Sequence, residues 1–294
     1  MSSLKHKSRE KGSGNRGVLG QLLLTLVAFL GLQVLIRYAG SVRGPVVEML
    51  GSWGIAGMEA RFVGSLVATV LMAAVVALYI KVSRTRLMAD ARGGWKSALG
   101  EYAKGVVVSS VMIGAIVALS LLGGGVRYVG LGRVGAVEFA AVMLLGVLNV
   151  REELLFRGWM MSQMRGYMSV WGAVVASSLL FGLSHAFNPN VTALALVNLS
   201  LLGAFWALCM LRSRSLWTVM AMHTFWNFAQ SKIVGMAVSG SGHNSSSLVK
   251  FEGVGGGLWG TGAFGLEGNL ATTIVIATAL IVVVVADRKK RMIR

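Results

Sequence analysis

The most constraining feature of this sequence is a set of apolar runs, each close to the ~20 residues that an α-helix needs to cross a membrane. Eight runs can be placed: 18–36, 62–80, 104–122, 138–164, 170–187, 191–211, 215–234 and 270–286. The chain is 13% charged, against roughly 25% in soluble domains. The runs therefore predict an all-α, polytopic membrane protein with about eight transmembrane helices.

The distribution of basic residues predicts how these helices are oriented. The formal net charge is +17, and most of the 28 Lys and Arg residues fall in segments that share one side of the membrane if the chain crosses it eight times. Membrane proteins keep such positive segments in the cytoplasm. We therefore predict cytoplasmic N- and C-termini, a location in the cell (inner) membrane, and a charge that sets orientation and does not bind nucleic acid.

Composition divides the chain into segments. Residues 1–17 predict a basic disordered tail, residues 18–286 a transmembrane helical domain, and residues 287–294 a basic cytoplasmic tail. Residues 235–269 are rich in Gly and Ser, lack an apolar period and predict a flexible external loop. The run at 18–36 exceeds the ~7–15 apolar residues of a signal peptide, so we interpret it as a retained helix, with cleavage near Ala39 as the alternative.

Two adjacent glutamates, Glu152 and Glu153, lie inside the run at 138–164. The apolar pattern continues past them to Arg165, so Glu152 lies roughly 20 Å from that end of the helix, at ~1.5 Å per residue. A charged side chain at this depth costs at least ~2.5–3.5 kcal/mol on insertion scales. The sequence holds only 11 acidic residues, and two of them at membrane depth predict a functional site.

The spacing of the charged residues predicts different roles for the two glutamates. Glu153 and Arg157 are i,i+4 with the acid nearer the N-terminus, which favours an ion pair along one helix face. An arginine within the membrane needs such a partner. Glu152 is rotated by about 100° from Glu153 and is free to face another helix. We therefore interpret Glu153 and Arg157 as a supporting pair, and Glu152 as the unpaired, functional carboxylate.

Two further apolar runs carry polar side chains at a similar depth. Phe181 and His185 are i,i+4, so an aromatic ring lies one helical turn from the imidazole on the same face. His223 and Asn227 have the same spacing and also share a face. We therefore expect the two histidines and Asn227 to lie close to Glu152 inside the bundle.

These residues, in this order on successive helices, carry a family resemblance. They resemble the motifs of the CPBP family, also called the Abi or CAAX-protease self-immunity family, which includes the type II CAAX prenyl endopeptidases. The three motifs are Glu152-Glu153-x-x-x-Arg157, Phe181-x-x-x-His185 and His223-x-x-x-Asn227. The resemblance covers about residues 138–234, the motif-bearing core, and no core motif position departs from the pattern.

The resemblance implies an intramembrane endopeptidase whose active site opens to the cytoplasm. It implies that Glu152, helped by His185, activates a water. It also implies that His223 and Asn227 stabilise the oxyanion of the tetrahedral intermediate, with Phe181 in a supporting role. The chemistry is compatible, because a carboxylate in apolar surroundings is a stronger base than in water. An imidazole and a carboxamide N–H are suitable donors to an oxyanion.

A metal site is the alternative for the same residues. Glu152, His185 and His223 form a Glu-plus-two-His set, which zinc hydrolases use with an open position for water. The His-Glu-x-x-His spacing of helical zinc proteases is absent. The only cysteine, Cys209, lies in an apolar run, which excludes a cysteine-rich site. We therefore expect no cofactor and keep zinc as the alternative.

Three classes of function fit the pattern. The first is an endopeptidase that cuts membrane-associated peptides near their C-terminus. Its candidate substrates are prenylated CAAX-type proteins or, for a bacterial chain, bacteriocin-like peptides, pheromone precursors or a partner membrane protein. The second is a transporter or channel that uses the glutamates as a proton or cation relay. The third is a non-catalytic scaffold, or an immunity protein that binds a peptide. The expected partners are a peptide or membrane-protein substrate and the lipid bilayer, and the sequence does not define an oligomeric state.

Overall fold

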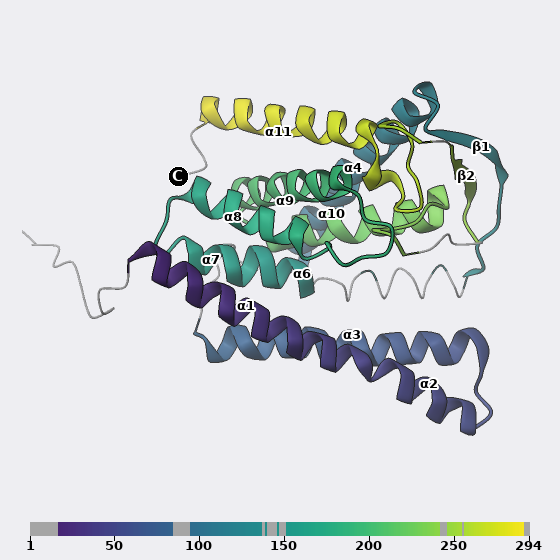
Figure 1. The fold of residues 1–294 in the computed structure, drawn as a ribbon, viewed down its shortest axis with the longest axis horizontal. Coiled ribbons are helices and arrows are strands. Elements are labelled where there is room, and N and C mark those ends of the chain that lie inside the picture. Colours follow the sequence, from purple (N-terminus) through teal and green to yellow (C-terminus); the bar gives the residue numbers. More distant parts are fainter. Residues whose placement is uncertain are drawn as a thin grey trace, which may run out of the picture.

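A computed structural model describes residues 17–84, 95–136, 139, 146, 151–241, 246–254 and 256–290. Most of the described chain is helical, and it includes one small antiparallel sheet (Figure 1). The helical segments are α1 (Val18–Ser41), α2 (Arg43–Ser52), α3 (Gly57–Val82), α4 (Trp95–Leu122), α6 (Arg151–Glu153), η1 (Leu154–Met160), α7 (Met161–Met164), α8 (Val170–Leu183), α9 (Ala193–Ser213), α10 (Leu216–Phe228), η2 (Ala229–Val234), η3 (Leu266–Gly268) and α11 (Leu270–Lys290). The strands are β1 (Val126–Leu131) and β2 (Val249–Gly253).

Several of these helices make the protein an integral membrane protein. Within the described residues, five stretches are long and apolar enough to cross a membrane: Val18–Ser52, Glu59–Val82, Ser97–Leu122, Ala193–Ser213 and Leu270–Asp287. α8 and α10, with 14 and 13 residues, are shorter than these. Much of the predicted run at 138–164, nearly all of the tail at 1–17 and the last four residues lie outside the described residues. The count of eight spans therefore stays a prediction.

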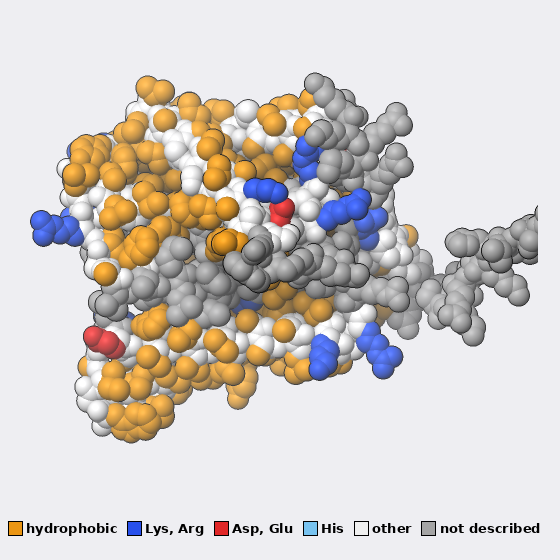
Figure 2. Space-filling view, turned by 180° about the vertical axis from the view of Figure 1, so that it is seen from behind, with side chains coloured by type: hydrophobic (Ala, Val, Ile, Leu, Met, Phe, Trp, Pro, Cys, Tyr) orange, Lys and Arg blue, Asp and Glu red, His pale blue; other side chains and the backbone are white. Residues whose placement is uncertain are grey.

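The outer surface of the bundle suits lipid surroundings. Hydrophobic side chains cover much of the face in Figure 2, and Val27 and Val111 are each 67% exposed, which is unfavourable over a large area in water. Most of the Lys and Arg side chains in this view lie toward its right-hand side. That is the end at which α1 begins and α11 ends (Figure 1).

Hydroxyl side chains set the starts of the three helices around the predicted site. Ser169 Oγ accepts a hydrogen bond from the Gly172 N–H at the start of α8. Thr192 and Ser215 cap α9 and α10 in the same way. Such caps satisfy backbone N–H groups that have no partner within the helix. α9 ends at Ser213, and its C-cap residue Arg214, in a left-handed conformation (φ 54°), turns the chain directly into α10.

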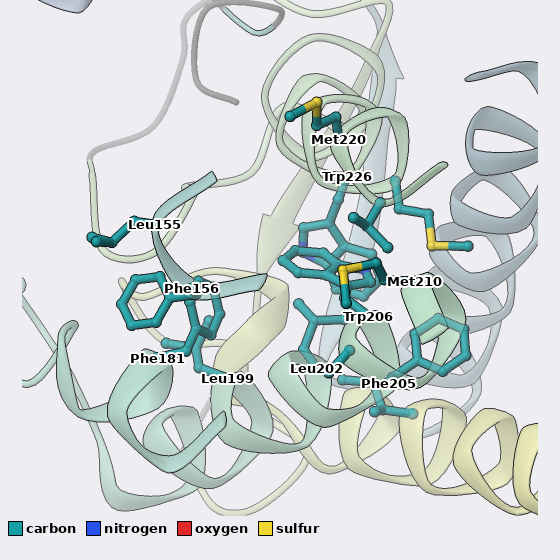
Figure 3. Close-up of a cluster of buried hydrophobic side chains, with 14 of the residues drawn as sticks. Leu155, Phe156, Phe181, Leu199, Leu202, Phe205, Trp206, Met210, Met220 and Trp226 are labelled. Carbon is teal, nitrogen blue, oxygen red and sulfur yellow. The ribbon is translucent and has the colours of Figure 1, made fainter. Parts of the chain in front are cut away.

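The helices of the bundle pack in pairs and layers: α1 and α2 pack on α3, α4 packs on α10, and α9 lies between α8 and α11. Aromatic side chains hold α9 and α10 together next to the predicted site. Trp206 of α9 and Trp226 of α10 meet edge to face, with ring centroids 6.4 Å apart. Figure 3 shows both rings among buried side chains of the surrounding helices, with Phe181 and Phe156 close by.

The backbones of α4 and α10 approach so closely at Gly105 that no side chain fits there. A Cβ at Gly105 would overlap the Thr218 carbonyl oxygen and lie 2.7 Å from Ala221 Cβ. We expect Gly105→Ala to lower the free energy of unfolding by about 1–3 kcal/mol through overpacking. Gly114→Ala is the control on the same helix, because no atom of the described residues lies within 4 Å of its added Cβ. Thermal unfolding of the purified variants measures both, and equal melting temperatures would contradict this packing.

The segment predicted to be a flexible loop, 235–269, is folded in its described parts. β2 pairs with β1, and Arg127 Nη2 lies 2.7 Å from Glu252 Oε2 across the pair. The Gly content that indicated flexibility includes tight packing positions, since a Cβ at Gly265 (φ 99°) would overlap the Ala237 carbonyl oxygen. The sheet also corrects the all-α prediction. The sequence did not indicate it, because two strands this far apart in the chain leave no local pattern of residues when they pair.

Candidate active site

All four residues predicted to be catalytic line one cavity of about 480 Å³. Glu152 comes from α6, and His185 comes from the turn that follows α8. His223 and Asn227 lie one helical turn apart on α10. The fold thus brings the predicted side chains of three helices to a single cavity, although His185 lies just beyond the end of its helix.

The helix that carries the glutamates is irregular. α6 ends at Glu153, the π-helical segment η1 follows, and α7 continues to Met164. The prediction that the helix extends past the glutamates is confirmed, because Arg165 is its C-cap. π-helical turns are rare and occur often at functional sites. The apolar pattern of the sequence contains no signal for this one.

The ion pair of Glu153 and Arg157 lies behind the cavity and is buried. Arg157 Nη1 donates to Glu153 Oε1 at 3.0 Å, and Nη2 donates to the Gly203 carbonyl oxygen at 3.2 Å. The guanidinium also lies over the Phe181 ring, 4.3 Å from its centroid, in a cation–π contact. The predicted pair is therefore confirmed, and contacts to α8 and α9 fix it in place.

The prediction that Glu152 has no ion-pair partner is wrong, and Glu153 has a second partner besides Arg157. Glu153 Oε1 also lies 2.8 Å from His223 Nδ1. Glu152 Oε1 is 3.5 Å from Arg151 Nη2, and its Oε2 is 3.9 Å from His223 Nε2. The i,i+4 rule describes neighbours on one helix, so it could not reveal a partner 70 residues away. Glu152 still differs from Glu153 in exposure, with side chains 28% and 0% exposed.

Hydrogen bonds fix which nitrogen of each histidine carries a proton. His185 Nδ1 lies 2.9 Å from the Phe181 carbonyl oxygen, which can only accept, so Nδ1 is the donor. His223 Nδ1 is held in the same way by the Glu153 carboxylate. In the neutral form of both rings, the atom that can accept a proton is therefore Nε2.

Aromatic rings hold both imidazoles in place. Trp206 stacks on His223, with ring centroids 4.5 Å apart and planes at 29°. Phe181 meets His185 at 5.0 Å and His223 at 6.1 Å in edge contacts. The predicted contact between Phe181 and His185 is confirmed. Trp206 was not among the predicted site residues, because it comes from a helix that carries none of the motifs.

A buried carboxylate outside the motifs, Glu267, supports the rim of the cavity. Its Oε1 accepts hydrogen bonds from Trp226 Nε1 at 2.9 Å and Gln230 Nε2 at 3.1 Å. Its Oε2 accepts from the N–H and the hydroxyl of Ser239 at 3.0 and 2.7 Å. Ser239 lines the cavity, and its carbonyl oxygen accepts from Asn188 Nδ2. The only signal in the sequence was an acidic residue just before the last apolar run.

The alternative zinc set does not form a recognisable metal centre. Within the described part of the chain, no group of three or more His, Cys, Asp or Glu side chains is placed to hold a metal ion. Glu152, His185 and His223 line the same cavity, and Nε2 is the nitrogen that either ring could offer to a metal.

Fold and cavity together define a helical integral membrane protein with a carboxylate–imidazole site between its helices. Residues 134–229 match the family model described as type II CAAX prenyl endopeptidase Rce1-like. This match confirms the resemblance to the CPBP and CAAX-protease family that the three motifs carry, and the family is one of proteases. No curated protein and no solved structure matches the chain.

Proposed function

We propose that the protein is an intramembrane endopeptidase that hydrolyses peptide bonds in membrane-associated substrates, with prenylated CAAX-type proteins as the first candidates. The observation that carries the proposal is the meeting of a carboxylate, two imidazoles and a carboxamide at one cavity inside a helical bundle. The family match supports the reaction class. The transport and scaffold alternatives gain no specific support from the geometry.

The cavity supports hydrolysis by an activated water. Glu152 takes a proton from the water while the water oxygen attacks the scissile carbonyl carbon. His185 Nε2 helps to hold the water, because Nδ1 of the same ring is committed to the Phe181 carbonyl oxygen. When the tetrahedral intermediate collapses, the C–N bond breaks and Glu152 returns the proton to the leaving amine nitrogen.

The negative charge of the intermediate falls to Asn227 and His223. The Asn227 carboxamide does not titrate, so its N–H can donate a hydrogen bond to the oxyanion at any pH. His223 Nδ1 is committed to Glu153, so Nε2 can donate to an oxyanion only when the ring is cationic. The carboxylates of Glu153 at 2.8 Å and Glu152 at 3.9 Å lie within ion-pair distance of the ring in that cationic form.

We also propose eight membrane crossings with both termini in the cytoplasm of the cell (inner) membrane. The described Lys and Arg side chains gather toward the end of the bundle at which α1 begins and α11 ends, which supports this orientation. The cavity, however, is lined by Gln33 and Arg37 late in α1 and by the turn after α8. With cytoplasmic termini it therefore lies in the half of the bundle away from the cytoplasm, which argues against the cytoplasmic opening that the family resemblance implies.

A thiol-labelling experiment decides on which side this end of the bundle lies. Asn190→Cys in a Cys209→Ala background places one thiol in the exposed turn between α8 and α9. In sealed right-side-out vesicles, we expect a membrane-impermeant maleimide to label it without permeabilisation. Labelling only after permeabilisation would place this end, and the cavity near it, on the cytoplasmic side.

Purified protein in liposomes provides the direct test of the activity. We expect one cut near the C-terminus of a membrane-anchored prenylated CAAX peptide, identified by mass spectrometry of the fragments. The same peptide without its prenyl group shows whether the lipid anchor is required. Intact peptides together with substrate-dependent proton flux would contradict the proposal and support a transporter.

Metal removal separates the two mechanisms. We expect treatment with a zinc chelator to leave the cleavage rate within about twofold, because a carboxylate-activated water does not depend on a bound ion, whereas a zinc hydrolase loses its nucleophile with the metal. Elemental analysis of the same active sample should find no stoichiometric zinc. Loss of activity on chelation with recovery on added zinc would favour the zinc mechanism.

A further inference from the structure

A second cavity, of about 700 Å³, lies on the other side of α10 from the candidate active site. α4, α9, α10 and α11 enclose it, and we call it the α4–α11 groove. Met222 lines this groove, whereas the next residue, His223, lines the active-site cavity. The two cavities are lined by different residues, and nothing in the proposed hydrolysis uses the groove.

The long walls of the groove are apolar and open toward the outside of the bundle. Val107 and Val111 of α4 and Val282 of α11 line it and are 60%, 67% and 61% exposed. Phe205 of α9 forms its buried floor. α4, α9 and α11 are among the five helices able to cross a membrane. The open side of the groove therefore faces the hydrocarbon region of the bilayer.

One end of the groove is charged. Glu101 accepts hydrogen bonds from Lys104 Nζ at 2.6 Å and from the Thr218 hydroxyl at 2.7 Å. Both oxygens of its carboxylate therefore already have a hydrogen-bond donor. Arg212, in the last turn of α9, also lines this end. Its Nη1 is buried and has no hydrogen-bond partner among the described residues. Two cations and one carboxylate leave the end of the groove net positive.

A buried guanidinium nitrogen without a partner is uncommon and calls for an acceptor. Arginine forms its strongest hydrogen bonds with carboxylates and phosphates. The acceptor must come with an apolar body, because the groove continues from Arg212 along valine side chains that face lipid. A phospholipid has both parts, and a net positive end favours a lipid with net negative charge over a zwitterionic one.

We propose that the α4–α11 groove binds one anionic glycerophospholipid, with its phosphate at Arg212 and an acyl chain between α4 and α11. The bound lipid supplies the acceptor that Arg212 Nη1 lacks and fills the apolar cavity. The site is separate from the candidate active site, so the proposal does not depend on the proposed protease activity.

Native mass spectrometry of the purified protein with phosphatidylglycerol or phosphatidylcholine tests this site. We expect a one-to-one complex with phosphatidylglycerol and binding of phosphatidylcholine weaker by at least about tenfold. Arg212→Gln should weaken phosphatidylglycerol binding by about tenfold, the loss expected for a charge-assisted hydrogen bond. The matched control is Arg214→Asn, which removes an exposed cation two residues away; asparagine tolerates the left-handed backbone there. It should bind like the wild type.

A second variant keeps the test decisive if Arg212→Gln folds poorly. Ala279→Phe fills the groove from α11 without touching the charge, and it should reduce phosphatidylglycerol binding to the same extent. Inorganic phosphate, added as a competitor, should not displace the lipid. Equal binding of the two lipids, wild-type binding by both variants, or displacement by phosphate alone would each overturn the proposal.

Discussion

Glu152→Gln is expected to reduce the rate of peptide cleavage by about 10²–10⁴-fold, the usual contribution of a general base, while the protein still folds. The amide keeps the size of the side chain but cannot take a proton from water. Its neighbours Arg151 and His223 lie at 3.5 and 3.9 Å, so little stabilising contact is lost. Cleavage in liposomes and thermal unfolding of the same preparation measure the two effects separately.

Two companion variants make this result specific. Glu48→Gln makes the same chemical change on an exposed position of α2 and should cleave at the wild-type rate. His185→Ala removes the second group proposed to hold the water and should also strongly reduce the rate of cleavage. Full activity in either Glu152→Gln or His185→Ala would rule out the proposed mechanism.

The sequence predicts much of this site because its information is local. Apolar runs give the helices, and i,i+4 spacing gives the shared faces of Phe181 with His185 and of His223 with Asn227. Charge scarcity marks Glu152 and Glu153 as functional, since a membrane tolerates few such residues. Each of these inferences needs only residues within one helical turn or the composition of one run.

What the sequence does not predict depends on contacts between distant segments. Trp206 stacks on His223 from another helix, and Glu267 reaches the cavity rim through its hydrogen bonds to Ser239. The pairing of β1 with β2 likewise joins segments more than a hundred residues apart. Glu153 makes one contact of each kind: its hydrogen bond with Arg157 is local and was predicted, whereas its hydrogen bond with His223 joins distant segments and was not.

This double role of Glu153 leads to the largest expected effect on stability. Arg157→Met should lower the free energy of unfolding by about 3–5 kcal/mol, the range for breaking a buried ion pair by removing one partner. Methionine fills much of the space of the arginine stem but leaves the Glu153 carboxylate buried without its cation. Arg127→Met is the control, because Arg127 forms a shorter pair with Glu252 at 2.7 Å that is exposed and should contribute at most about 1 kcal/mol.

A double variant distinguishes lost pairing from lost packing. Glu153→Leu with Arg157→Met removes both charges, and it should be more stable than the sum of the two single effects predicts, because a buried pair can often be replaced by apolar residues at little cost. Its cleavage should nevertheless stay low, since His223 Nδ1 loses the acceptor that orients the ring. Unfolding in mixed micelles for all four combinations gives the coupling energy. Additive effects would show that the ion pair does not stabilise the fold, and wild-type cleavage by the double variant would show that Glu153 does not position His223.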